Sequence, residues 1–345
     1  MVSYFVFLIC LILLLLLPFV LRRKAFLVVV FLTLFSGLRY GIGTDYFTYR
    51  KIFLRSRFID YARSPYEIGF LFLNKVIRSL TEQPVWLFII CAFLTALFVV
   101  MSLSQLNKVF GLNFEVSVFC YVLLGQYFAS FNITRQSLAG AIILFAFTKF
   151  AQNRKSTSVI LVLLASTIHS TALIVLPFIL LSRLKNSLFY SLVSAFAVLS
   201  LFSYERILSL VSSFLPIYSG YVGTRYTTSG ANVLNVIPFI VLTFSVFVFN
   251  RSLFDEEGMG LFMRLLLVGS VFSMMSLFGL AFARIANYFW IASVVVVPRF
   301  LDGFNKEEKP ITYLIVIATM IMYMTLYVSN YGDLIPYRTI FGLVF

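Results

Sequence analysis

The chain has 345 residues, of which 61% are hydrophobic and only 12% are charged, which excludes a soluble domain and indicates the bilayer as its solvent. Its 27 Lys and Arg residues outnumber its 13 Asp and Glu residues and give a formal net charge of +14. Because no soluble basic domain accompanies this charge, we expect phospholipid headgroups and an anionic substrate as partners, and no nucleic acid.

Long, continuous apolar runs predict a polytopic all-α membrane protein and not a barrel, whose strands would alternate over about ten residues. The first run lacks the basic start and the small-residue cleavage site of a signal peptide, so we expect it to be a membrane segment. Three cysteines, Cys10, Cys91 and Cys120, lie within such runs and are expected to be packed thiols. The runs that approach or reach a spanning length are 2–20, 25–38, 84–103, 113–131, 136–150, 187–203, 234–249, 260–282, 284–300 and 311–328.

The segment 157–182 has His169 at its centre and can form one tilted span or a hairpin of two short helices. The basic loops decide between the two, because short loops rich in Lys and Arg stay in the cytoplasm. A hairpin puts all the basic loops on one side, so we expect a hairpin, an outer N-terminus and about twelve membrane segments, within a range of roughly ten to thirteen. These loops are Arg22–Lys24, Lys108, Lys149–Lys155, Arg183–Lys185, Arg251–Arg264 and Arg299–Lys309.

The outer side then holds the segments 39–83 and 204–233 and the tail from Ser329, all within a single transmembrane domain over 1–345. Interfacial tyrosines in the second segment can stack on sugar rings or anchor the chain at the membrane surface. These are Tyr218, Tyr221 and Tyr226.

Two helices are expected within the first outer segment. Ser64 and Glu67 have the spacing of a capping box, which predicts an amphipathic helix over 65–80 in the membrane interface. Asp45 would cap a second helix over 46–58.

The motif Arg39-Tyr40-Gly41-Ile42-Gly43-Thr44-Asp45-Tyr46 follows the second apolar run. Its glycines allow close backbone approach, and the guanidinium of Arg39 can hold a phosphate. The alternative is an arginine that reaches to the interface, followed by a glycine turn and an aspartate cap.

The motif Asn132-Ile133-Thr134-Arg135-Gln136 opens the fifth run. We expect Asn132 to cap that helix, which leaves Arg135 in its first turn against an unfavourable helix dipole. An anion bound there would be favoured by both the dipole and the guanidinium, so a functional role is expected.

Two candidates can act as a general base. His169 is the only histidine and lies at the apex of the predicted hairpin, although a lone histidine is also common as a hydrogen-bonded core residue. Asp45 is the second candidate, and Glu67 ranks below it because the capping box explains Glu67 fully. Arg284 interrupts an almost wholly apolar stretch and either binds an anion or reaches to the interface. No His and Cys cluster and no acidic cluster occurs, so neither a metal ion nor another cofactor is expected.

Taken together, these motifs resemble the EpsG/Wzy group of bacterial polysaccharide polymerases. The family's opening signature is similar to 39–46, with Tyr49 and Glu67-Ile68-Gly69 further on. The later signatures are similar to 131–139, 169–173 and 284–289, in the family's order. Beyond residue 290 only the hydropathy pattern matches.

The resemblance implies a metal-independent membrane glycosyltransferase of GT-C-like architecture. It would transfer a glycan from undecaprenyl pyrophosphate to the end sugar of a second lipid-linked repeat unit, at the outer face of the bacterial cytoplasmic membrane. The implied partners are this lipid-linked oligosaccharide, membrane lipid and a chain-length regulator protein. His169 and Asp45 are the implied catalytic residues, and the implied substrate-binding residues are Arg39, Tyr40, Glu67, Arg135, Gln136, Arg284 and Tyr288.

Two other functions use similar residues. A flippase for the same oligosaccharide would also need arginines and many spans, but it predicts charges at mid-membrane and two-fold hydropathy symmetry, which the sequence lacks. An O-antigen ligase would share the arginines and the histidine and would differ only in its acceptor.

Overall fold

The computed structural model describes residues 1–58, 64–181, 184–214, 229–256 and 258–343. Within these ranges every regular element is a helix, and the β-type pairing is limited to one isolated bridge between Arg39 and Thr339, so the all-α prediction is confirmed. The helices are α1 (Val2–Leu16), α2 (Leu21–Gly37), α3 (Tyr46–Arg55), α4 (Ile68–Leu80), α5 (Val85–Phe110), α6 (Phe114–Leu123), α7 (Gln126–Ala129), α8 (Thr134–Ala151), α9 (Lys155–Ile168), η2 (Ser170–Ile174), α10 (Val175–Leu181), α11 (Asn186–Phe214), α13 (Val233–Phe249), η4 (Arg251–Phe254), α14 (Met259–Met275), α15 (Leu280–Trp290), α16 (Ser293–Asp302) and α17 (Lys309–Asn330).

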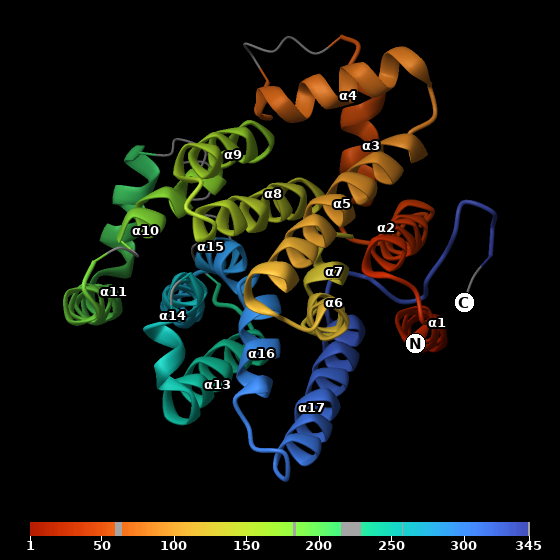
Figure 1. Ribbon diagram of the computed structural model, residues 1–345. Coiled ribbons are helices and arrows are strands. Elements are labelled where there is room, and N and C mark those ends of the chain that lie inside the picture. The colour runs from red at the N-terminus through yellow and green to blue at the C-terminus, as the bar shows by residue number, and fades with distance from the viewer. Residues whose placement is uncertain (59–63, 182–183, 215–228, 257, 344–345) are drawn as a thin grey trace.

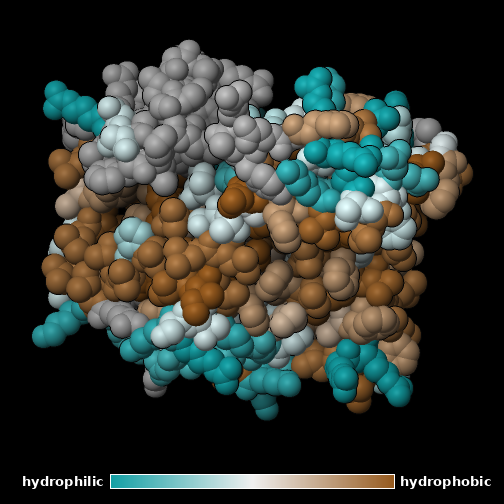
Figure 2. Space-filling view, turned by 90° about the horizontal axis from the view of Figure 1, so that it is seen from above, coloured by the Kyte–Doolittle hydropathy of each residue, from teal (hydrophilic) through white to brown (hydrophobic). Residues whose placement is uncertain are grey.

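The outer surface has the hydropathy of a membrane protein. Figure 2 shows a broad hydrophobic band between two hydrophilic rims. Of the described helices, α5 and α17 are each long and apolar enough to cross a membrane, and α15 with α16 can form a third span bent by 52°. Most of the other apolar helices have 10–17 residues.

Two predicted runs are interrupted in the structure, and the segment 157–182 breaks at the residue expected at the apex of the hairpin. The run 113–131 becomes α6 and α7, because Gly125 between them takes a left-handed conformation with φ of 78°. The run 284–300 becomes α15 and α16, and the segment 157–182 breaks at an extended His169 between α9 and η2.

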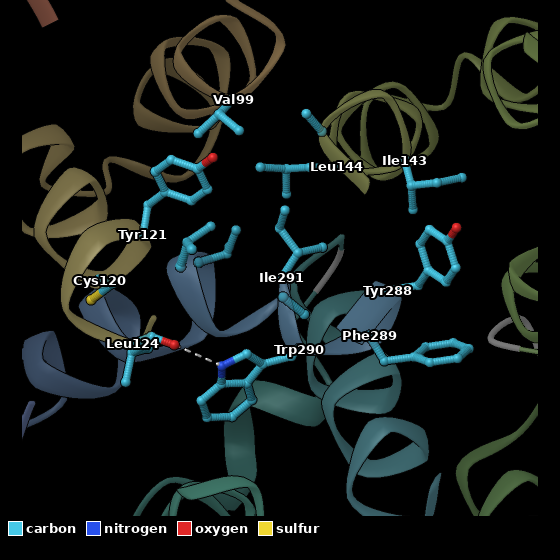
Figure 3. Close-up of a cluster of buried hydrophobic side chains, with 14 of the residues drawn as sticks. Val99, Cys120, Tyr121, Leu124, Ile143, Leu144, Tyr288, Phe289, Trp290 and Ile291 are labelled. Atoms are coloured by element: carbon cyan, nitrogen blue, oxygen red, sulfur yellow. Dashed lines mark hydrogen bonds between the residues drawn. The ribbon is translucent and has the colours of Figure 1, made fainter. Parts of the chain in front are cut away.

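The first two breaks lie against one another. The indole nitrogen of Trp290, at the end of α15, donates to the carbonyl of Leu124 at 3.2 Å (Figure 3). Gln126 of α7 in turn donates to the carbonyl of Trp290 at 3.0 Å and to the hydroxyl of Ser293 at 2.9 Å. Side chains thus satisfy polar groups that the interrupted helices leave open.

The core lies around α8, which is buried on nearly every face. Figure 1 shows α8 near the centre of the molecule, with α5, α9 and α15 around it, and each of these three helices contacts it. Small residues such as Ala139, Gly140 and Ala141 let its neighbours approach, as is usual in membrane bundles.

Three predicted helix caps are wrong. The helix predicted over 65–80 begins at Ile68 and not at residue 65, and Glu67 precedes it without making a side-chain cap. The second helix is α3, which starts after Asp45 and ends at Arg55, and the side chain of Asp45 makes no capping bond. The residue before α8 is Ile133 and not Asn132. Local spacing predicted these caps, but the side chains of Glu67 and Asn132 have tertiary partners that compete with capping, as described below.

The helix predicted over 187–203 is longer than expected, because α11 continues to Phe214 and takes up the start of the segment 204–233. The three tyrosines at 218, 221 and 226 lie outside the described residues.

The C-terminal tail returns to the segment that follows α2, and its last described residues lie beside α1 and α2, close to the N-terminus, in Figure 1. The amide of Tyr40 donates to the carbonyl of Arg338 at 2.9 Å, and the amide of Ile340 donates to the carbonyl of Leu38 at 3.0 Å. The tail therefore packs directly on the first sequence motif.

Candidate functional site

A carboxylate, an imidazole and a guanidinium from three distant motifs meet beside the start of α8. Glu67 precedes α4, Arg135 lies in the first turn of α8, and His169 occupies the break after α9. Nδ1 of His169 lies 3.1 Å from Oε1 of Glu67, and Arg135 donates to Oε2 of the same carboxylate. The side chains of His169 and Glu67 are only 5% and 8% exposed, so this ion-pair cluster lies largely inside the protein.

The Glu67 carboxylate is fully occupied by donors. Its Oε1 also accepts from the amide of Ser170 at 3.0 Å and from the Ser170 hydroxyl at 3.3 Å. Burial alone would raise the pKa of Glu67, but the hydrogen bond from His169 and the charge of Arg135 outweigh it and lower the pKa from 4.5 to about 2. Glu67 is therefore a carboxylate at neutral pH, and it holds the imidazole instead of capping a helix.

Arg135 is held between this carboxylate and two aromatic rings. Its guanidinium lies 5.1 Å from the centre of the Tyr66 ring and 5.5 Å from that of Phe70. No side chain caps the first turn of α8, so the positive end of the helix dipole adjoins the Arg135 charge. An anion placed there would contact both.

A pocket of about 340 Å³, called here the polar pocket because polar side chains stand among the apolar residues of its wall, lies on the opposite face of the first turns of α8. Four of the predicted site residues line it: Asp45, Gln136, Arg284 and Tyr288. Four further tyrosines line it as well, Tyr121, Tyr323, Tyr327 and Tyr331. A pocket with this many ring faces and hydroxyl groups suits a sugar, which offers both apolar faces and hydrogen-bonding edges.

Adjacent residues connect the pocket to the ion-pair cluster. Gln136 follows Arg135 directly, lines the pocket and donates to the carbonyl of Arg284. The hydroxyl of Tyr288, also in the pocket wall, lies 3.0 Å from that of Thr171, two residues after His169. The charge of Arg284 acts on His169 as well. The second, third and fourth sequence motifs therefore meet at one place.

Arg39 and Tyr40 do not line this pocket. Arg39 is 1% exposed. Its guanidinium lies between the rings of Phe88 and Phe131, at 5.0 and 4.8 Å from their centres, and donates to the carbonyl of Phe131 at 3.3 Å. Tyr40 is half exposed and packs edge-on against Tyr46. In this arrangement Arg39 connects the first motif to the second by its contacts with Phe131. The guanidinium is buried, so a phosphate could bind it only after a rearrangement of the surrounding residues.

Asn132 is a structural residue whose role the sequence did not reveal. Its Oδ1 accepts from the amide of Thr44 at 2.6 Å and from the Thr44 hydroxyl at 3.0 Å. Gly43, with φ of 94°, would place a Cβ only 2.4 Å from the carbonyl oxygen of Phe131. The glycine of the first motif is thus needed for close approach to the second, and this contact positions Asp45 at the pocket.

The pocket also contains residues from the tail that no motif signalled. Tyr331 and Gly332 line it, and a Cβ on Gly332 would lie 1.7 Å from Nδ2 of Asn132. These tail residues are about 200 positions from Asn132 in the sequence, so only the folded structure shows that they belong to the same pocket.

Among the described residues, no group of three or more His, Cys, Asp and Glu side chains is placed to hold a metal ion. Arg284 lines the pocket and Arg135 belongs to the ion-pair cluster on the other face of α8, and both arginines carry a fixed charge.

The comparison with protein families agrees with the sequence motifs and extends beyond them. The model of the EpsG family matches residues 22–339, and this range includes Thr339 of the tail, which forms the isolated bridge with Arg39. No curated protein and no solved structure matches the chain. Because the match spans nearly all of its 345 residues, the chain belongs to the EpsG family.

Proposed function

We propose that this chain is a polysaccharide polymerase that transfers a glycan from undecaprenyl pyrophosphate to the end sugar of a lipid-linked repeat unit at the outer face of the cytoplasmic membrane. The EpsG family and the apolar helices support a polysaccharide polymerase-like membrane protein. The proposed transfer reaction rests on one observation, that a pocket and an ion-pair cluster lie on the two sides of the first turn of α8. A sugar-sized polar pocket lies on one face, and the Glu67–Arg135–His169 cluster lies on the other.

The reaction needs stabilisation of the leaving group. The acceptor hydroxyl oxygen forms a bond to the anomeric carbon as the bond from that carbon to the pyrophosphate oxygen breaks, and the pyrophosphate leaves with the electron pair. We assign the stabilisation of this charge to Arg135, Arg284 and the amide groups at the start of α8. Arginine suits this role because its planar fork can contact two phosphate oxygens at once.

The acceptor hydroxyl must also lose a proton, and we assign the base to His169. An Nδ1–H group that donates to Glu67 fixes the imidazole tautomer and leaves the lone pair of Nε2 to accept the proton. The anionic carboxylate then stabilises the imidazolium that forms. Asp45 lines the pocket, where it can orient the acceptor sugar by accepting hydrogen bonds from its hydroxyl groups.

The test is a deletion of the gene followed by gel analysis of surface glycan. A polymerase defect should leave a single repeat unit on the surface and no ladder of longer chains. Complete loss of surface glycan would contradict the proposal, because a flippase or a ligase defect gives that result.

A further inference from the structure

An apolar groove of about 780 Å³ lies on the face of α8 that points away from the polar pocket. It is formed by α4, α5, α8 and α9, and its wall consists of hydrocarbon side chains apart from one glycine and Thr167. The Thr167 hydroxyl donates to the carbonyl of Leu164 in its own helix at 2.8 Å, so it offers little to a polar ligand. The groove therefore suits a hydrocarbon chain.

The groove begins at the ion-pair cluster. Ile68 in its wall follows Glu67, and Ile168 precedes His169. Arg135 lies on the same stripe of α8 as the groove residues Leu138 and Ile142, at spacings of three and seven residues. One end of the groove is therefore marked by a guanidinium.

The helices at this end are in direct contact. A Cβ on Gly69 would lie 2.4 Å from the Thr167 hydroxyl oxygen and 2.7 Å from the Thr167 carbonyl oxygen, so the backbone of α4 packs directly on Thr167 of α9. The wall is open to the outside both at this end, where Ile68 is 64% exposed, and farther along, where Phe72 is 64% and Leu164 45% exposed. These side chains leave apolar surface that a ligand can cover.

We infer that this groove binds the polyprenyl chain of the lipid-linked glycan, an inference that rests on the proposed function. Such a substrate consists of a sugar and a hydrocarbon chain joined by a pyrophosphate. The polar pocket on one face of α8 suits the sugar, and the apolar groove on the other face suits the hydrocarbon chain. Gln136, Ser137 and Gly140 face the polar pocket, whereas Leu138 and Ile142 face the groove. The pyrophosphate then lies at the first turn of α8, beside Arg135.

The charge at the end of the groove favours a lipid that carries a phosphate group, and not a helix of a partner protein. Arg135 and the uncapped start of α8 complement a phosphate group, which a hydrophobic peptide segment does not carry. The proposal commits to the prenyl chain, and acyl chains of bilayer phospholipid are the competing occupant that the experiment must separate.

The experiment compares two neighbouring leucines of α9. Leu164 lines the groove, whereas Leu163 does not, and they are similarly exposed, at 45% and 49%. Leu164→Trp fills the groove with a larger side chain, and Leu163→Trp is the matched control. Each purified variant is assayed with lipid-linked repeats on a full-length prenyl chain and on a chain shortened to two isoprene units.

We expect Leu164→Trp to raise KM for the full-length substrate by roughly tenfold or more, as for other misfits in apolar sites, and to change KM for the short substrate much less. Leu163→Trp should behave like the wild type with both. An equal preference for the long chain in Leu164→Trp and in the wild type would overturn the inference.

A second measurement needs neither catalysis nor a folded Trp variant. A prenyl pyrophosphate without sugar, carrying a photoreactive group on its chain, should crosslink the wild type at α4 and α9. Unlabelled prenyl pyrophosphate should compete with it, whereas phosphatidylglycerol should not. Equal competition by phosphatidylglycerol would mean that the groove holds ordinary acyl chains. If the crosslinks are competed as expected while the wild type forms no polymer from any lipid-linked repeat, the proposed function fails and the prenyl site stands.

Discussion

Glu67 and His169 are 102 residues apart in the sequence, yet Oε1 of the carboxylate lies 3.1 Å from Nδ1 of the imidazole. This contact gives the only histidine of the chain a fixed orientation and places an anion where an imidazolium would form. It also explains why Glu67 does not cap the helix that follows it.

The Glu67 contacts predict a pH-dependent stability. The pKa of Glu67 is lowered from 4.5 to about 2 in the folded protein, so its contribution is fully present above about pH 4.5 and is lost as the pH falls through about 2. When thermal unfolding is followed in detergent between these pH values, the melting temperature of the wild type should fall as the pH falls. This fall should be absent in Glu67→Gln.

At neutral pH, Glu67→Gln should itself lower the free energy of unfolding by about 3–5 kcal/mol, because Arg135 keeps a buried charge without its partner. If the stability of the two proteins depends on acid pH in the same way, the Glu67 carboxylate does not make the contacts described with His169 and Arg135.

Two arginines should respond differently to replacement by lysine. Arg135→Lys keeps the charge but loses the planar fork, so it should insert normally and lower turnover by roughly one to two orders of magnitude. Arg39→Lys should instead lower the melting temperature, because the buried guanidinium binds the Phe131 carbonyl and lies between two rings. Arg55→Lys, at an exposed position in the last turn of α3, is the control. A stable Arg39→Lys protein with a raised KM for the lipid-linked substrate would restore a direct phosphate role for Arg39.

Alanine substitutions at two glycines with positive φ can distinguish the cost of backbone strain from the cost of losing a close contact. Gly111, at φ 66°, has nothing within 4 Å of an added Cβ, whereas Gly43, at φ 94°, meets the Phe131 carbonyl oxygen at 2.4 Å. Gly111→Ala should cost only about 1–2 kcal/mol, the penalty of the left-handed conformation. Gly43→Ala should in addition separate the first two motifs and abolish polymer formation. Similar melting temperatures and polymer yields in both variants would mean that the close approach is unimportant.

The placement of the basic loops predicts the topology. In a background in which the exposed Cys10 is replaced by serine, Leu80→Cys at the end of α4 should react with a membrane-impermeant maleimide in intact cells. Glu307→Cys, which is exposed between α16 and α17, should react only after permeabilisation. Labelling of both cysteines in intact cells would contradict the hairpin around His169, because a single span at 157–182 puts both positions outside. The inverse pattern would contradict the outer placement of the first motif.

The sequence predicted the helices well, because long apolar runs have few alternatives in lipid. The helix over 311–328, for example, differs from α17 by two residues at each end. The break at Gly125 was missed, because one glycine in an apolar run gives no sign that its φ is positive. The bend between α15 and α16 is supported by Gln126, a contact across 164 residues that periodicity cannot show.

The sequence indicated candidate residues, but it did not indicate how they are arranged. Arg135, Gln136, His169 and Arg284 do lie together, but Glu67 was ranked low because a local capping pattern explained it. The tail residues Tyr331 and Gly332 had no recognisable pattern at all. In each case the missing information was a tertiary contact, which can override a local propensity.

The central claim is that His169, held by Glu67, supports glycan transfer between lipid-linked repeats. The measurement is a polymerisation assay with purified protein in lipid nanodiscs and lipid-linked repeat units, read as a ladder on a gel and as released prenyl pyrophosphate. The wild type should give both products, and His169→Ala and His169→Gln should each lower the rate by roughly 10²–10⁴, the usual contribution of general acid–base catalysis. A His169→Gln protein that polymerises at close to the wild-type rate would contradict the account, and the role of base would then pass to Asp45.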